Sequence, residues 1–117
     1  KLAFGFSVPG THYFPMQFFE AKYVLTADPF PLTHVNDPEN EMSHKLNEMF
    51  LAVRDEYFAL EETFDMGNGT TFTIWRRTVA PSRAEVEYYL SAFTEEDAKY
   101  PEMFSQVAEN WLAARGL

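Results

Sequence analysis

The sequence predicts an α+β fold in which helices cover a mainly antiparallel sheet of four strands. Two observations predict it: large side chains recur at every second position in some segments, and apolar residues recur every three or four positions in others. The predicted order along the chain is β-β-α-β-β-α-α. Because 117 residues is the usual size of one domain, we expect residues 1–117 to form a single domain.

The first two strands are predicted in residues 2–8 and 17–26. Large side chains alternate with small ones from Leu2 to Val8, a pattern typical of strands. In the second segment the odd-numbered positions would share one face and the even-numbered positions the other. We expect these two strands to pair with each other.

A long amphipathic helix is predicted over residues 38–57. Asp37 followed by Pro38 is a start signal, because Asp caps the free N–H groups of the first turn and Pro fits its first position. The spacing of the apolar residues that follow places them on one face. They are Met42, Leu46, Met49, Phe50, Val53 and Tyr57.

Residues 57–79 are predicted to form a β-hairpin that turns at Gly67-Asn68-Gly69. A three-residue loop, with Gly69 in the left-handed conformation, sets Phe64 opposite Phe72. A two-residue loop would divide the apolar residues between two faces, so we favour the longer loop. The favoured register gathers one apolar face, formed by Phe58, Leu60, Phe64, Phe72 and Ile74.

Two helices are predicted after the hairpin. Ser82 and Glu85 match a capping box, and the apolar positions that follow continue as far as Phe93. Pro101 marks the start of the last helix, and Gly116 marks its end.

Charge is distributed unevenly along the chain. Eighteen acidic residues against nine basic ones give a net charge of −9. Residues 37–65 carry −7 and residues 85–109 carry −6, whereas residues 66–84 carry +3 from three arginines. A negative exterior repels phosphate backbones, so we expect no direct nucleic-acid binding and instead a basic protein partner.

Several kinds of site and location are disfavoured. The chain has no cysteine, which excludes disulfides and thiolate metal sites. Glu41 and His44 have the Glu-x-x-His spacing of di-iron bundles, but no second such motif occurs, so we predict no metal and no cofactor. No apolar stretch is long enough to span a membrane and no signal segment opens the chain, so we expect a cytoplasmic protein without membrane contact.

The favoured functional hypothesis is a small acidic module that binds a basic partner protein. Carboxylates spaced along helices can imitate a row of phosphates, so the module could be an inhibitor or a nucleic-acid mimic. The residues predicted to bind the partner are Glu41, Glu48, Asp55, Glu95, Glu96 and Asp97.

A second hypothesis is a small enzyme or ligand-binding domain with an aromatic-lined pocket between sheet and helices. The hairpin register sets Glu62 opposite Ile74 and diagonal to Arg76, close enough for the two charged groups to meet. The catalytic candidates are Glu62, Arg76, Tyr57 and His34.

A third hypothesis is a structural or assembly subunit that forms a homo-oligomer. Aromatic residues are abundant, and some lie off the predicted inward faces. Left uncovered on the outer side of the sheet, they would form an apolar interface; alternatively, the C-terminal helices cross to that side and bury them. The candidate interface residues are Phe18, Phe30 and Trp75.

Overall fold

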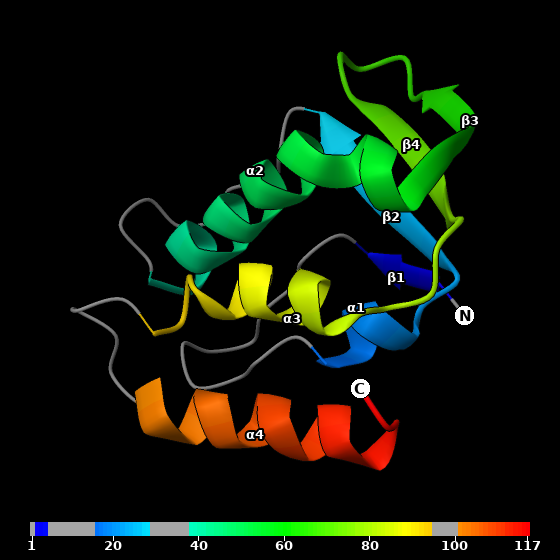
Figure 1. The fold of residues 1–117 in the computed structure, drawn as a ribbon. Helices are drawn as coiled ribbons and strands as arrows, with labels where there is room; N and C mark the ends of the chain where they lie inside the picture. Colours follow the sequence, from blue (N-terminus) through cyan, green and yellow to red (C-terminus); the bar gives the residue numbers. More distant parts are fainter. Residues whose placement is uncertain (1, 5–15, 29–37, 95–100) are drawn as a thin grey trace.

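The computed structural model describes residues 2–4, 16–28, 38–94 and 101–117, and all structural statements below concern these residues. The described part is an α+β fold with helices at one side of a sheet (Figure 1). Its elements are β1 (Leu2–Phe4), α1 (Met16–Glu20), β2 (Tyr23–Asp28), α2 (Pro38–Tyr57), β3 (Phe58–Asp65), β4 (Thr71–Arg77), α3 (Arg83–Leu90) and α4 (Pro101–Ala114).

The sheet differs from the predicted one. Its antiparallel part has three strands in the spatial order β2-β4-β3. The short β1 lies beside β2 but runs parallel to it. The prediction of a four-stranded, mainly antiparallel sheet is therefore wrong, because three of the described strands form the antiparallel sheet and β1 is parallel. The predicted element order β-β-α-β-β-α-α is also wrong, because α1 lies between β1 and β2. Parallel neighbours need a crossover connection, and α1 lies within that connection.

Helix α1 occupies residues that were predicted as the first half of a strand. Phe18 and Phe19 are adjacent in sequence, yet each is only 2% exposed. Both rings contact Tyr89 of α3, and Phe19 also contacts Trp111 of α4. Adjacent residues of a strand point to opposite faces, so a helical turn is the better way to bury both rings on the same helices.

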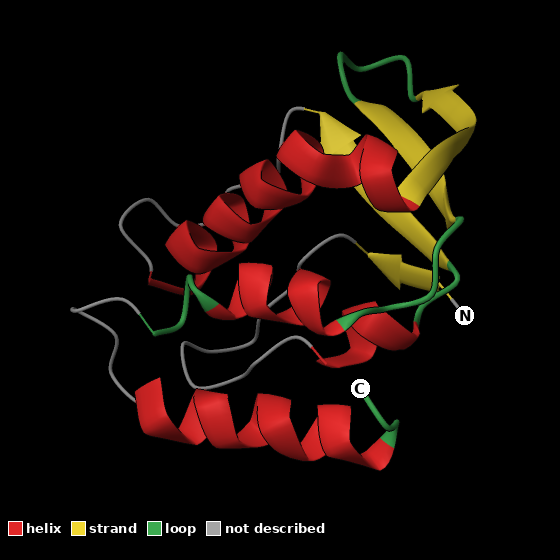
Figure 2. Ribbon diagram, in the orientation of Figure 1, coloured by secondary structure: helices red, strands yellow, loops and turns green. Residues whose placement is uncertain are grey.

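The helices lie together on one side of the strands, and α4 lies farthest from them (Figure 2). One core, rich in aromatic rings, lies between the sheet and the helices and continues among the helices, where Phe93 contacts Phe104. It comprises Phe18, Phe19, Val24, Leu46, Phe50, Phe58, Trp75, Val86, Tyr89, Ala92, Phe93, Phe104, Ala108, Trp111 and Leu112. The indole N–H of Trp75 donates to the Thr26 hydroxyl at 2.9 Å, so the polar atom of this buried ring is satisfied.

Two of the three candidate interface residues belong to this core. Phe18 is 2% exposed and Trp75 is 8% exposed. Phe18 lies in α1 instead of a strand, and α2 covers Trp75 through Phe50. Within the described residues, these two side chains therefore form no exposed apolar patch. Phe30 lies outside the described residues.

The hairpin turn has the predicted form. The Met66 N–H donates to the Thr70 carbonyl at 3.0 Å, and Gly67 and Gly69 both have positive φ angles. Phe64 lies opposite Phe72, as the three-residue loop requires.

Further from the turn, the hairpin departs from the predicted register. A β-bulge falls between Leu60 and Glu62 and sets Leu60 opposite the buried Trp75. Phe58 and Leu60 therefore do not share a face with Phe64, and the predicted apolar face of five residues is not formed.

The starts of three helices agree with the sequence signals. Helix α2 begins at Pro38 and α4 at Pro101, while Ser82 caps α3 by accepting the Glu85 N–H at 3.2 Å. The Glu85 side chain, however, does not complete the capping box, because it binds an arginine. Among the described helices, none has the length and apolar character needed to span a membrane.

Candidate functional site

The predicted contact between Glu62 and Arg76 is replaced by another ion pair. The Arg76 Nε donates to Glu61 Oε2 at 3.0 Å, and both side chains are about half exposed. At the bulge two residues of β3 oppose one residue of β4, which brings Glu61 within reach of Arg76. The one-residue displacement therefore leaves Glu62 exposed on β3 without an ion-pair partner in the described chain.

The remaining catalytic candidates do not join a common site. Tyr57 is the last residue of α2, and its carbonyl accepts the Thr78 N–H at 2.8 Å. Burial, helped by the nearby Glu85 carboxylate, raises the pKa of the Tyr57 phenol. His34 lies outside the described residues.

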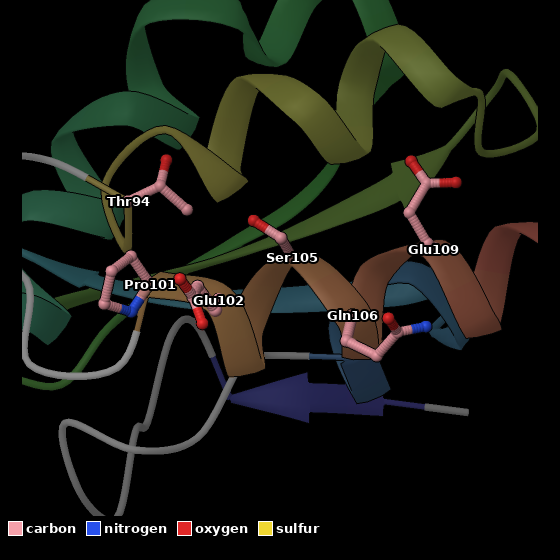
Figure 3. Close-up of a pocket in the computed structure, with 6 residues that line it drawn as sticks. All are labelled: Thr94, Pro101, Glu102, Ser105, Gln106 and Glu109. Carbon is pink, nitrogen blue, oxygen red and sulfur yellow. The ribbon is translucent and has the colours of Figure 1, made fainter.

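Two hollows lie elsewhere on the described surface. One, of about 320 Å³, is open and lies between Thr94 and one side of α4 (Figure 3). Its lining consists of Thr94, Pro101, Glu102, Ser105, Gln106 and Glu109, none of them aromatic. The other, of about 340 Å³, lies between the end of α1 and residues 77–81. Neither hollow is lined by Glu62, Arg76 or Tyr57, so neither is the predicted aromatic-lined pocket.

A buried ion pair links the end of β4 to the start of α3. Arg77 donates to both carboxylate oxygens of Glu85, at 2.8 and 3.2 Å. The Arg77 side chain is 8% exposed and the Glu85 side chain is fully buried. The guanidinium also lies over the rings of Phe18 and Phe58. Burial raises the pKa of Glu85, although Arg77 opposes this by favouring the charged form.

Two exposed arginines neutralise further carboxylates. Arg83 binds both oxygens of Glu109, at 2.7 and 3.3 Å, and lies 3.6 Å from Glu87. Arg83 thereby lowers the pKa of Glu109. Arg115 pairs with Glu20 and lies 3.9 Å above the Trp111 ring. In the described parts of α3 and α4, most carboxylates are therefore bound by arginines of the same chain.

The acids of α2 and β3 are arranged differently. Five exposed carboxylates there have no arginine or lysine ion-pair partner in the described chain, and we name them the α2–β3 acidic region: Glu48, Asp55, Glu56, Glu62 and Asp65. Outside this region, Asp28 and Glu102 are also exposed without such a partner among the described residues, each as a single position.

No protein-family model, curated protein or solved structure matches this chain.

Within the α2–β3 acidic region, the helical residues form one exposed stripe. Glu48, Asp55 and Glu56 are spaced seven and eight positions apart, which places them on one side of α2. Leu51 and Ala52 lie between them and are also exposed. Glu48 lies 3.1 Å from the His44 imidazole, a contact that is an ion pair only when His44 is protonated.

The strand residues lie on an outer strand of the sheet. In the described sheet β3 pairs with β4 alone, and every residue from Leu60 to Gly69 is exposed. The Asp65 carboxylate accepts the Gly67 N–H at 2.9 Å, which fixes the start of the turn and leaves the charge uncompensated. The region therefore combines negative charge with large exposed apolar side chains, namely Leu60, Phe64 and Met66.

The predicted partner-binding residues divide into two groups. Glu48 and Asp55 are exposed and belong to the α2–β3 acidic region. Glu41 lies in α2, but its side chain is not described, and residues 95–97 lie outside the described chain. Sequence reasoning missed Glu56 and Asp65 and assigned Glu62 a different role. Among the described residues, no group of three or more His, Asp or Glu is arranged to hold a metal ion.

Proposed function

We propose that this chain is a binding module that docks a basic partner protein through the α2–β3 acidic region. The observation that carries the proposal is the contrast in ion pairing. Arg77 at the end of β4 and Arg83 of α3 are engaged by internal carboxylates, whereas five described carboxylates of α2 and β3 are exposed without an arginine or lysine. Such carboxylates remain available to lysines and arginines of another protein.

The composition of the region supports protein docking. Protein interfaces combine an apolar centre with a polar rim, and Leu51 and Leu60 are exposed close in sequence to these acids. The carboxylates along α2 recur about two helical turns apart, about 11 Å at 1.5 Å per residue. A negative row of this kind can occupy a surface that binds phosphates, so inhibition by nucleic-acid mimicry is the specific form of the proposal.

The proposal is tested by comparing two double variants that change the net charge equally. Asp55→Asn with Glu62→Gln removes two unpaired carboxylates, whereas Glu87→Gln with Glu109→Gln removes two carboxylates already near Arg83. The probe is a fluorescent 16-residue oligolysine, and its affinity is measured by anisotropy at several salt concentrations. We expect the first variant to bind the oligolysine about tenfold more weakly and the second no more than twofold more weakly. Carboxylates that are already paired with Arg83 contribute little to the affinity for an added cation.

Salt supplies an independent criterion. Binding by exposed carboxylates should weaken steeply between 50 and 300 mM salt, because screening shortens the range of the field. If the two double variants lost oligolysine affinity equally, binding would follow net charge alone. That result, or an affinity insensitive to salt, would contradict docking through the α2–β3 acidic region.

A further inference from the structure

The outer edge of β3 is an open strand edge. β3 has eight residues and, within the described sheet, pairs on one side with β4. From Leu60 onward every residue of the strand is exposed, so nothing in the described chain covers the other side of this stretch. An open edge presents main-chain N–H and C=O groups that can pair with an added strand.

Two hydrogen bonds show which residues point outward. Arg77 donates its N–H to the Lys22 carbonyl at 2.8 Å, so the main chain of Arg77 faces the β2 side. Met66 donates its N–H to the Thr70 carbonyl across the hairpin. Hydrogen-bonded and non-bonded pairs alternate in an antiparallel ladder. Since Met66 is bonded to β4, Asp65 and Thr63, one and three residues before it, belong to non-bonded pairs and direct their N–H and C=O groups away from β4.

The bulge divides β3 into two parts. Up to Leu60 the strand precedes the bulge, and at the bulge Glu61 is held by Arg76. From Glu62 to Asp65 the pairing with β4 runs without interruption to the turn. A regular stretch with outward-facing main chain therefore exists on the turn side of the bulge.

The side chains of this stretch select its occupant. Glu62 and Asp65 are exposed and unneutralised within the described chain, and Phe64 offers an apolar surface that is 40% exposed. A second copy of the same edge would bring like charges together, which is a recognised way of preventing self-association. An extended segment with lysine or arginine side chains meets opposite charge instead.

We propose that β3, between its bulge and the turn, receives an extended cationic segment of the partner protein as an added strand. The main-chain groups of Thr63 and Asp65 bind the backbone of that segment. Glu62 and Asp65 bind its cations, and Phe64 contacts an apolar side chain. This inference rests on the proposed function, since it specifies how the basic partner docks.

The test uses three peptides with the same charge. The first is an eight-residue peptide in which pairs of lysines alternate with pairs of valines, so that each face of the extended chain carries both residue types. The other two have the same sequence with N-methyl groups on alternate backbone nitrogens, one peptide for each of the two possible phases. N-methylation removes donors from one edge of an extended peptide but keeps its charge. We expect one of the two methylated phases to bind at least tenfold more weakly, because it loses the hydrogen bonds to β3.

Amide hydrogen exchange of the protein provides a second readout. Bound peptide should slow the exchange of the Thr63 and Asp65 amides by at least tenfold, because their N–H groups gain acceptors. Thr63→Pro removes one outward donor and should weaken binding of the unmethylated peptide. Circular dichroism checks that this variant is folded. The methylated peptides are tested on the unaltered protein, so they probe strand addition even where Thr63→Pro does not fold.

The outcomes distinguish this inference from the proposed function. If both methylated phases bind as well as the parent peptide, strand addition is overturned while electrostatic docking stands. If no cationic peptide binds, and the oligolysine does not bind either, both proposals fail. If the Thr63 and Asp65 amides become protected with rising protein concentration alone, a second copy occupies the edge and the cationic segment is overturned.

Discussion

Two acid-rich regions that look alike in the sequence differ in whether their carboxylates are paired with arginines of the same chain. Residues 37–65 carry a net −7 and residues 85–109 a net −6. In the second region Glu85, Glu87 and Glu109 all lie within ion-pair distance of an arginine. In the first, five described carboxylates have no such partner within the described chain. The charge of a segment therefore does not reveal which carboxylates a partner can reach.

The difference follows from where the arginines lie in three dimensions. Arg77 points from β4 into the core and Arg83 points from α3 to α4. Arg76 faces β3, where it binds Glu61. Arg54, which belongs to α2, lies over the Trp75 ring and donates to the Leu51 carbonyl. The three predictions that follow change one region and leave the other intact.

The largest expected effect comes from loss of the buried ion pair between Arg77 and Glu85. Arg77→Ala removes the only ion-pair partner described for Glu85 and leaves its carboxylate buried. We expect the free energy of unfolding to fall by about 3–5 kcal/mol, measured by urea denaturation, because an unpaired buried charge is strongly unfavourable.

The matched control replaces both charges with apolar side chains. Arg77→Met with Glu85→Leu should unfold within about 1–2 kcal/mol of the parent protein, because apolar replacement of a buried pair is often nearly neutral. If Arg77→Ala alone had no measurable effect, the pair would not be the link between β4 and α3 that its geometry indicates.

The second prediction concerns the pH dependence of stability, which should differ between the buried Arg77–Glu85 pair and the exposed Arg83–Glu109 pair. Burial raises the pKa of Glu85 above its ordinary 4.5, so the unfolded chain releases this proton before the folded protein does. The stability of the parent relative to Glu85→Gln should therefore be greatest below about pH 4.5 and decline as pH rises through the folded pKa. Urea denaturation of both proteins from about pH 4 to about pH 7 measures this difference.

Glu109 should show the opposite slope. Arg83 holds its pKa below 4.5, so the contribution of Glu109 is present above that pH and is lost as pH falls through the folded pKa. The effect should be small and should diminish with salt, because the pair is exposed. If Glu85→Gln and Glu109→Gln showed the same slope, burial would not be the dominant influence on Glu85.

Much of the local structure was predictable because its signals lie within a few residues. Pro38, Ser82 and Pro101 mark three helix starts correctly, and the glycines of the hairpin loop set Phe64 opposite Phe72. Each of these features depends on turn or cap chemistry that a short segment contains in full.

The errors arise where distant residues decide. Residues 17–26 were predicted as one strand, but Tyr89 and Trp111 provide the surface that buries the adjacent rings of Phe18 and Phe19 from a helix. In β3 the bulge gives Arg76 a different ion-pair partner, which is Glu61 and not the predicted Glu62. Neither the contact with remote helices nor the bulge leaves a periodic signal in the sequence.

The candidate site was predictable only in part for the same reason. Glu48 and Asp55 could be assigned to a solvent face of α2, because helical spacing opposes them to the apolar stripe. Glu62 and Asp65 gain their importance from β3 being an outer strand. That position depends on β2 pairing with the other side of β4, which is a non-local feature of strand order.

The third prediction adds an arginine to the α2–β3 acidic region. Ala52 is exposed on α2, four residues after Glu48 and four before Glu56. Ala52→Arg should pair with these acids, and we expect the free energy of unfolding to rise by about 0.2–0.5 kcal/mol. Binding of the oligolysine should weaken about fivefold, because the new guanidinium competes with the lysines for the same carboxylates.

Ala113→Arg is the matched control, because Ala113 is exposed on α4 four residues after Glu109. It adds the same charge four residues after a glutamate, but in the part of the fold that already contains Arg83 and Arg115. The two variants therefore have equal net charge and differ in which acids they neutralise. Oligolysine affinity should change less than twofold in this variant, and an equal loss in both would show that the fold's unequal pairing has no consequence for binding.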